Sequence, residues 1–148
     1  MKLSFQSESA LVDESSLAPL DLVIPVTTPE LTRASIRAAE QLACGIHAEI
    51  RLLKVQLVPF PLQITAPPVP LEFLRAQLEK YGSSLPVKRE IELARDFEPA
   101  VLKALRPGSV VLICSKRRRW RTHNERLAAE LRRAGCPVIL TFEGGQHA

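Results

Sequence analysis

The sequence predicts an α/β fold, an open, twisted parallel sheet with helices on both faces. Apolar runs typical of buried strands alternate along the chain with segments of helical periodicity. The first strand, helix and strand fit within residues 20–58, which is typical of a βαβ unit with parallel pairing and a right-handed crossover. The length of 148 residues, 46% of them hydrophobic and 24% charged, suits one globular domain.

The first strand is the apolar run LDLVIPV at residues 20–26. Thr28 has the side chain of an N-cap, and Pro29 suits the first turn of the helix that follows. The apolar positions of this helix, at helical spacing, are Leu31, Ala34, Ala38 and Leu42. Gly45 follows where a left-handed residue ends a helix, so residues 47–58 form the second strand.

The middle of the chain starts with a connection, residues 59–70, whose five prolines exclude a helix or a central strand. A helix that ends at Gly82 follows, and its apolar positions are Leu71, Leu74, Leu78 and Tyr81. Residues 87–93 alternate apolar and charged side chains, which is typical of an edge strand. Glu90 and Glu92 share the charged face of this strand, so we expect both carboxylates to be hydrated.

The last part of the chain predicts a helix, a buried strand, a second helix and a final strand. The first of these helices begins at Asp96 or Phe97, and its apolar face is formed by Val101, Leu102 and Leu105. The buried strand is SVVLIC at residues 109–114, and the final strand is CPVILTF at residues 136–142. The helix between them ends at Gly135, and its inward positions are Leu127, Ala128, Leu131 and Ala134.

We expect one domain over residues 19–143, preceded by a flexible arm of residues 1–18 and followed by a tail of residues 144–148. No window approaches the ~18 consecutive apolar residues of a membrane span. The N-terminus also lacks the apolar run of a secretory signal. These features predict a cytoplasmic protein with no membrane partner.

Positive charge is concentrated in one segment of the chain. The chain has 20 Lys and Arg against 16 Asp and Glu, a net charge of +4, but residues 115–133 carry +6 and residues 1–22 carry −3. The segment KRRRWR lies directly after a buried strand and before a helix, where α/β sheets bind anions. Trp120 is available there to stack on a base. The candidate anion-binding residues are Lys116, Arg117, Arg118, Arg119 and Arg121.

A solvated basic loop is the simpler interpretation of KRRRWR, because short basic runs are frequent by chance. The small net charge of the whole chain and the acidic residues 1–22 also argue against tight binding of a polyanion. We therefore do not expect nucleic acid as a partner, and an anion- or nucleic-acid-binding module stays as an alternative.

Neither a catalytic group nor a metal site stands out in the sequence. Cys44, Cys114 and Cys136 are too far apart for a zinc or CxxC motif, so we interpret them as small buried hydrophobic residues. Cys114 and His123 lack a third residue nearby that would orient them. We predict no catalytic residue and no bound metal.

Three pieces of the sequence carry a family resemblance by their order and spacing. They are LVIPVTTPELTRASIRAAEQLACGIHAEIRLLKV, ELARDFEPAVLKALRPGSVVLICS and ERLAAELRRAGCPVIL, and the CPV ending is the most specific feature. Together they resemble the universal stress protein family over roughly residues 20–142. The resemblance implies a Rossmann-like sheet of order 3-2-1-4-5, the adenine nucleotide alpha hydrolase-like arrangement. It also implies dimerisation and a nucleotide cleft at the carboxyl ends of strands 1 and 4.

Many members of that family bind ATP, but this sequence departs from both features that support binding. Thr27 occupies the position of an aspartate after the first strand. The glycines of a G-x2-G-x9-G loop fall on Cys114, Arg117 and the vicinity of Asn124, so backbone N–H groups lose their close approach to phosphates. Two lost hydrogen bonds of about 1.5–3 kcal/mol each weaken binding on the order of 100-fold or more. The candidate cleft residues are Val26, Thr27, Thr28, Val55, Cys114, Ser115, Arg117 and Asn124.

The leading hypothesis is a non-catalytic, universal-stress-protein-like module with a stress-related or regulatory role, weak or no ATP binding and no required cofactor. One alternative is a member that binds ATP or another adenine nucleotide, and hydrolyses ATP slowly, using the Arg-rich loop for the phosphates. We also expect a homodimer through residues 136–142, because this strand is apolar on both faces and lies at a sheet edge in the implied order.

Overall fold

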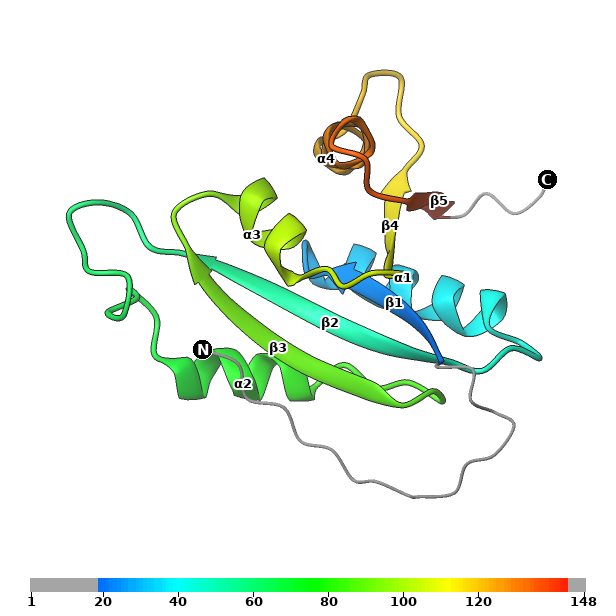
Figure 1. Ribbon diagram of the computed structural model, residues 1–148, viewed down its shortest axis with the longest axis horizontal. Coiled ribbons are helices and arrows are strands. Elements are labelled where there is room, and N and C mark those ends of the chain that lie inside the picture. Colours follow the sequence, from blue (N-terminus) through cyan, green and yellow to red (C-terminus); the bar gives the residue numbers. More distant parts are fainter. Residues whose placement is uncertain (1–18, 144–148) are drawn as a thin grey trace.

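The computed structural model describes residues 19–143, which form one parallel sheet of five strands in the order β3-β2-β1-β4-β5 (Figure 1). This confirms the predicted fold class and the strand order that the family resemblance implied. The expected arm, residues 1–18, and tail, residues 144–148, lie outside the described residues. In chain order the elements are β1 (Leu20–Pro25), α1 (Pro29–Leu42), β2 (Ala48–Leu57), α2 (Leu71–Glu79), β3 (Val87–Ala94), α3 (Phe97–Ala104), β4 (Val110–Lys116), α4 (His123–Arg133) and β5 (Val138–Glu143).

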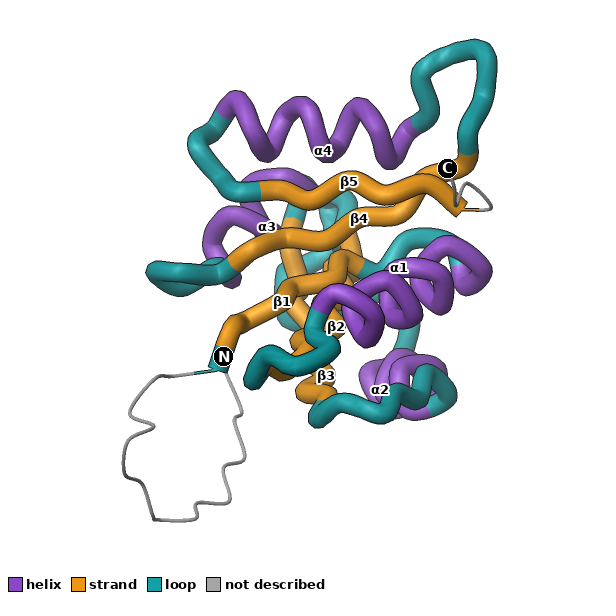
Figure 2. The backbone as a smooth tube through the Cα atoms, turned by 90° about the vertical axis from the view of Figure 1, so that its right-hand side faces the viewer, coloured by secondary structure: helices purple, strands orange, loops and turns teal. Residues whose placement is uncertain are grey.

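The sheet separates two apolar cores, each covered by a pair of helices (Figure 2). Helices α1 and α2 cover one face, where Leu22 and Ile24 of β1 point. Helices α3 and α4 cover the other face, where Val23 points, because successive side chains of a strand alternate between faces. The continuous apolar character of β1 therefore follows from burial on both sides.

Helix α1 buries only part of the face that its apolar spacing predicted: Ala34 is buried and Ala38 packs against the core, but polar residues beside them are buried too. Leu42 is 45% exposed, whereas the buried residues are Thr32, Ala34, Ser35, Ile36 and Ala39. The Thr32 hydroxyl accepts a hydrogen bond from the Thr27 N–H at 3.1 Å. The Ser35 hydroxyl accepts one from the Cys114 N–H at 3.0 Å. These hydroxyls are buried because backbone N–H groups in β4 and just after β1 need hydrogen-bond partners. The spacing of apolar residues gives no sign of this need.

Two predicted apolar positions at helix ends are also wrong, while the predicted glycine ends are correct. Leu71 is 38% exposed at the start of α2. Ala134 is exposed because α4 ends at Arg133, so the alanine follows the last helical turn. Gly45 and Gly135 have φ angles of +82° and +90°, the left-handed conformation expected after a helix.

A buried arginine ties three strands to α3. Arg51 of β2 is 1% exposed. Its guanidinium donates to the Asp21 carboxylate of β1 at 2.9 Å and to the Glu90 carboxylate of β3 at 2.9 Å. It also donates to the Ala104 carbonyl at the end of α3, at 3.0 Å. The Ser109 hydroxyl donates to Asp21 at 2.6 Å, so the carboxylate has partners on both sides.

The expectation that Glu90 and Glu92 are simply hydrated is therefore wrong for Glu90. A guanidinium that leaves water needs an anionic partner, and Glu90 is one of the two that Arg51 has. Glu92 lies on the same strand, 3.9 Å from the exposed Lys103 ammonium. Such an exposed pair contributes little to stability.

The Arg51 cluster makes stability depend on pH in a defined direction. Burial alone would raise the pKa of the Asp21 carboxyl, but hydrogen bonds from Arg51 and Ser109, with the charges of Arg51 and Arg106, outweigh it and hold this pKa below its usual value. A carboxylate whose pKa falls on folding stabilises the native state above its unfolded pKa. This stabilisation is lost as pH falls through the lowered pKa of the folded state.

Within residues 19–143, no helix combines the length and apolar character needed to cross a membrane.

The proline-rich connection between β2 and α2 is held by short turns, in which the Leu62 N–H donates to the Pro59 carbonyl and the Ala66 N–H to the Gln63 carbonyl.

Replacing Arg51 with alanine is expected to lower the free energy of unfolding by about 3–5 kcal/mol, because Asp21 and Glu90 lose their common partner in a buried site. Urea denaturation followed by circular dichroism measures the change. Arg75→Ala, on the exposed side of α2, is the control and should stay within about 0.5 kcal/mol of the parent. Equal stabilities for the two variants would contradict the role of the cluster.

Candidate functional site

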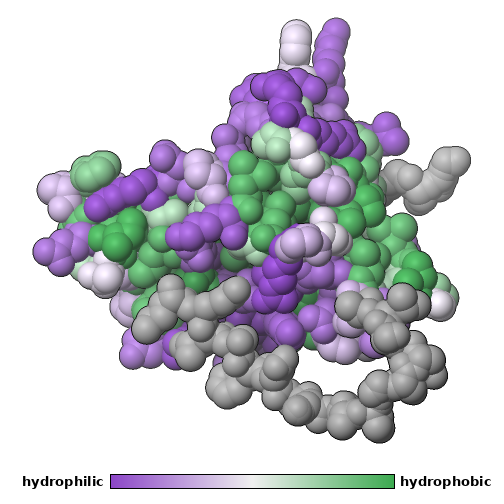
Figure 3. All heavy atoms as spheres, viewed as in Figure 1, coloured by the Kyte–Doolittle hydropathy of each residue, from purple (hydrophilic) through white to green (hydrophobic). Residues whose placement is uncertain are grey.

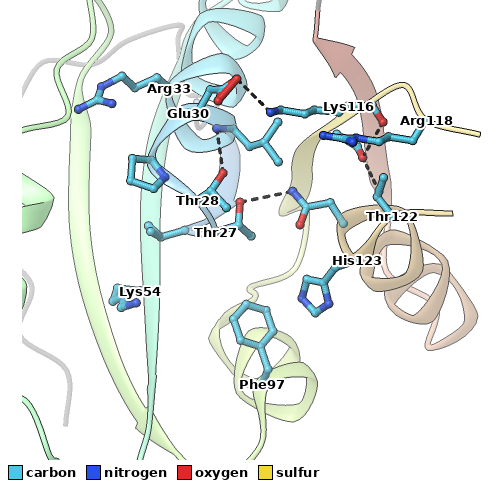
Figure 4. Close-up of a pocket in the computed structure, with 15 residues that line it drawn as sticks. Thr27, Thr28, Glu30, Arg33, Lys54, Phe97, Lys116, Arg118, Thr122 and His123 are labelled. Carbon is cyan, nitrogen blue, oxygen red and sulfur yellow. Dashed lines mark hydrogen bonds and ion pairs between the residues drawn. The ribbon is translucent and has the colours of Figure 1, made fainter. Parts of the chain in front are cut away.

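A cleft opens at the carboxyl ends of β1 and β4, which are neighbours in the sheet (Figure 4). From these ends the chain leaves toward opposite faces, into α1 after β1 and toward α4 after β4. Such a reversal is the usual position of a ligand in open α/β sheets. The cavity measures about 870 Å³. It is lined by Val26, Thr27, Thr28, Pro29, Glu30, Leu31, Arg33, Lys54, Phe97, Ser115, Lys116, Arg118, Thr122, His123 and Asn124.

One buried amide closes the floor of this cleft. Asn124, in the first turn of α4, is 5% exposed. Its side-chain amide donates to the Cys114 carbonyl at 2.8 Å and to the Thr27 hydroxyl at 3.3 Å. An amide has two N–H groups, so both are engaged. The polar groups at the ends of β1 and β4 thus bond to one another through α4.

Helices α1 and α4, which begin at the cleft after β1 and β4, carry side-chain caps. In α1, the Thr28 hydroxyl accepts from the Leu31 N–H at 3.3 Å. In α4, the Thr122 hydroxyl accepts from the Glu125 N–H at 3.2 Å, and the Glu125 carboxylate accepts from the Thr122 N–H at 2.8 Å, which is a capping box. The Ser115 hydroxyl also bonds to the Thr122 hydroxyl. The caps occupy backbone N–H groups of the kind that bind anions at helix N-termini.

Four basic side chains reach the cleft from separate parts of the fold. Arg33 comes from α1, Lys54 from β2, Lys116 from β4 and Arg118 from the following loop. Lys116 lies 3.3 Å from the Glu30 carboxylate. Among residues 19–143, Lys54 and Arg118 take part in no ion pair, and they lie on opposite sides of the cleft in Figure 4. The cleft therefore keeps uncompensated positive charge.

Five of the candidate cleft residues meet at this cavity: Val26, Thr27, Thr28, Ser115 and Asn124. Val55 and Cys114 are buried and do not line it. Arg117 points elsewhere, with its guanidinium 4.7 Å from the centre of the Phe142 ring on β5.

Only some of the candidate anion-binding residues line the cavity. Lys116 and Arg118 line the cavity, whereas Arg119 and Arg121 are exposed outside it. Trp120 is 79% exposed. The basic segment thus contributes partly to the cleft and partly to the outer surface.

Lys54, Phe97 and His123 also line the cavity, and the sequence analysis did not include them in the cleft. Lys54 interrupts the apolar run of β2 near its carboxyl end, and this interruption was the available signal. Phe97 and His123 are the first residues of α3 and α4. First helical residues after parallel strands gather at the same edge of a sheet, so this position was a second signal.

The described residues form no group of three or more His, Cys, Asp and Glu that could hold a metal ion. Burial raises the pKa of the Cys114 thiol, so the thiol stays protonated at neutral pH. Burial likewise raises the pKa of Cys136. Cys44, in contrast, is exposed, so its predicted burial is wrong: it lies in the turn after α1.

One solved structure with this architecture identifies the fold. Universal stress protein UspA from Lactobacillus plantarum superposes with a TM-score of 0.51 at 15% identity, over 84% of this chain and 99% of that chain. The fold is that of a universal stress protein. A member of the universal stress protein family from Burkholderia pseudomallei gives a TM-score of 0.48 at 18% identity, over 82% of this chain and 94% of that chain. Neither a protein-family model nor a curated protein sequence matches the chain.

The universal stress protein likeness confirms, at the level of the fold, the resemblance seen in the three sequence pieces. It extends over 84% of this chain. At 15% identity the comparison shows the fold alone. The chemistry of the cleft therefore has to be argued from the side chains of this protein.

Asn124→Ala is expected to lower the free energy of unfolding by about 1–3 kcal/mol, because the Cys114 carbonyl loses its buried donor. Thermal or urea denaturation measures the change, and Gln63→Ala, in the exposed β2–α2 connection, is the control. An unchanged stability for Asn124→Ala would show that the floor of the cleft is not held by this amide.

Proposed function

We propose that this protein is a non-catalytic module of the universal stress protein type whose cleft binds ATP weakly or not at all. One observation carries the proposal: the polar groups on the floor of the cleft already bond to one another. Asn124 bridges Thr27 and the Cys114 carbonyl, and the Thr27 N–H donates to Thr32. A ligand would have to replace these bonds before it could use the same groups.

ATP does not fit this cleft as a tightly held cofactor. No glycine occurs between Ser109 and Ala134, so a backbone nest cannot approach the phosphates closely. The N-termini of α1 and α4 are capped by Thr28 and Thr122. Glu30 also pairs with Lys116 in the cleft, so this ammonium is not free for a phosphate.

The absence of an activated nucleophile in the cleft supports a non-catalytic role. The Ser115 hydroxyl bonds to the Thr122 hydroxyl, which is no general base. The Cys114 thiol is buried, and burial raises its pKa. A regulatory or stress-related role, in which the module binds rather than reacts, agrees with these features.

The uncompensated cations favour a second candidate function, the binding of a nucleotide or another small anion through side chains. Lys54 and Arg118 lie on opposite sides of the cavity and form no ion pair with any described residue. Flexible Lys and Arg stems lose rotamer freedom when they bind, so this route gives weaker affinity than a preformed backbone nest.

ATP, ADP and AMP at about 1 mM are expected to leave the melting temperature unchanged. A ligand present at 100 times its Kd would add about 2.7 kcal/mol of stability and would be seen easily. A denatured extract of the purified protein should likewise contain no stoichiometric nucleotide. A clear shift that disappears in Lys54→Ala/Arg118→Ala would favour the side-chain-binding candidate and overturn weak ATP binding.

We also propose a homodimer that forms through β5. This strand is a sheet edge, and its side chains are half-buried on both faces. Two of its buried atoms, Thr141 Oγ1 and Glu143 Oε1, have no hydrogen-bond partner among the described residues. A two-fold partner would cover this edge with a self-complementary contact.

Sedimentation at micromolar concentration is expected to give the mass of two chains. Leu140→Lys should lower the dimer affinity, because a charge at the centre of the edge would have to be buried in the contact. Since Leu140 also packs on the core below α4, circular dichroism must first show that the variant is folded. A single-chain mass for the parent, stable on dilution, would contradict the proposal.

A further inference from the structure

The loop between β4 and α4 projects from the body of the protein (Figure 1). We call residues 117–121, with the sequence RRRWR, the basic loop. Hydrophilic side chains gather at this end of the molecule in Figure 3. The cleft explains only part of the basic loop, because Arg118 alone among its residues lines the cavity.

Both ends of the basic loop are held by contacts with the fold. Before it, Lys116 pairs with Glu30 at 3.3 Å. At its start, Arg117 stacks on the Phe142 ring. After it, Thr122 forms the capping box of α4. The contacts of Lys116, Arg117 and Thr122 therefore fix the two ends of the basic loop on the fold.

The side chains at the tip face solvent and have no partner in the described part of the chain. Trp120 is 79% exposed, and Arg119 and Arg121 on either side of it are also exposed. Neither arginine takes part in an ion pair or side-chain hydrogen bond there. An indole between two free guanidinium groups exposes an apolar ring that water solvates poorly.

Two acidic side chains near the basic loop are already engaged. Glu125 accepts the hydrogen bond of the capping box, and Glu30 pairs with Lys116. Arg126, one turn into α4, adds a further exposed cation. The local charge is therefore strongly positive, although the net charge of the whole chain is only +4. The expectation against nucleic acid rested on that whole-chain charge, on the acidic residues 1–22 and on how often short basic runs occur by chance.

We propose that the basic loop binds single-stranded nucleic acid without sequence preference. Trp120 stacks on an unpaired base, and Arg119 and Arg121 contact the neighbouring phosphates. A duplex keeps its bases stacked and offers the indole no face. A membrane surface fits less well, because Trp120 is the only apolar side chain in the loop and stable insertion needs a larger apolar area. The proposal is independent of what the cleft binds.

Trp120 is the only tryptophan in the chain, so its fluorescence reports contact at the loop directly. The full-length protein is titrated with unlabelled oligo-dT and oligo-U of about 12 nucleotides, with a duplex of the same length, and with vesicles containing phosphatidylserine. We expect quenching by both single strands, with a Kd in the micromolar range at about 50 mM salt, and weaker binding of the duplex. The affinity should fall with salt at a log–log slope of about 0.7 per phosphate contacted.

Variants of the basic loop distinguish binding at the loop from attraction to the overall positive charge of the protein. Their affinities are measured by fluorescence anisotropy with labelled oligo-U. Trp120→Ala should lower the affinity roughly 5- to 150-fold, the loss of one base–aromatic stack, whereas Trp120→Phe should retain most of it. Arg119→Ala/Arg121→Ala should flatten the salt slope by about 1.4. The control, Arg75→Ala/Arg133→Ala, removes the same charge from exposed positions outside the loop and should leave binding nearly unchanged.

Several results would overturn the proposal. They are the absence of quenching by single strands, an equal loss in the control and the loop variants, and equal binding of duplex and single strand. A blue shift with vesicles but no response to oligonucleotides would assign the loop to a membrane surface instead. Circular dichroism checks that each variant is folded, so a loss of binding reports on the loop itself.

Discussion

The guanidinium of Arg51 occupies a position that the rest of the sheet must accommodate. It lies in β2, next to the centre of the sheet, and is almost inaccessible to water. Its partners come from β1, β3 and the end of α3, so one side chain fixes the relative positions of four elements. A charge of this kind is tolerated only when every donor is satisfied. Asp21 and Glu90 therefore serve the fold and are not available for chemistry at the cleft.

The same requirement, that buried polar groups find partners, shapes the other end of the sheet. At the carboxyl ends of β1 and β4 the partners are Thr27, Thr32, Ser35 and Asn124. The cleft opens there, and its floor is closed by internal hydrogen bonds. The fold of a universal stress protein therefore does not by itself assign a ligand to this cleft, because ligand chemistry depends on the side chains present.

Positive charge is distributed between two neighbouring regions with different surroundings. Lys54 and Arg118 face a cavity that also contains Glu30 and two capped helices. Arg119 and Arg121 face open solvent beside an exposed indole. Arg118 and Arg119 are adjacent in the sequence, yet the first lines the cavity and the second faces solvent.

The sequence by itself determined the features that depend on local pattern. Continuous apolar runs predicted the buried strands, alternation predicted β3 as an edge strand, and Gly45 and Gly135 predicted helix ends. The absence of glycine after β4 was also visible directly. Only the tertiary structure decided which polar residues of α1 are buried, why Arg51 can lie in the core, and which residues meet at the cleft. The reason is physical: periodicity reports the hydrophobicity of neighbours in the chain, whereas the burial of a charge or hydroxyl depends on partners far away. Asp21 and Ser109, for example, are 88 residues apart.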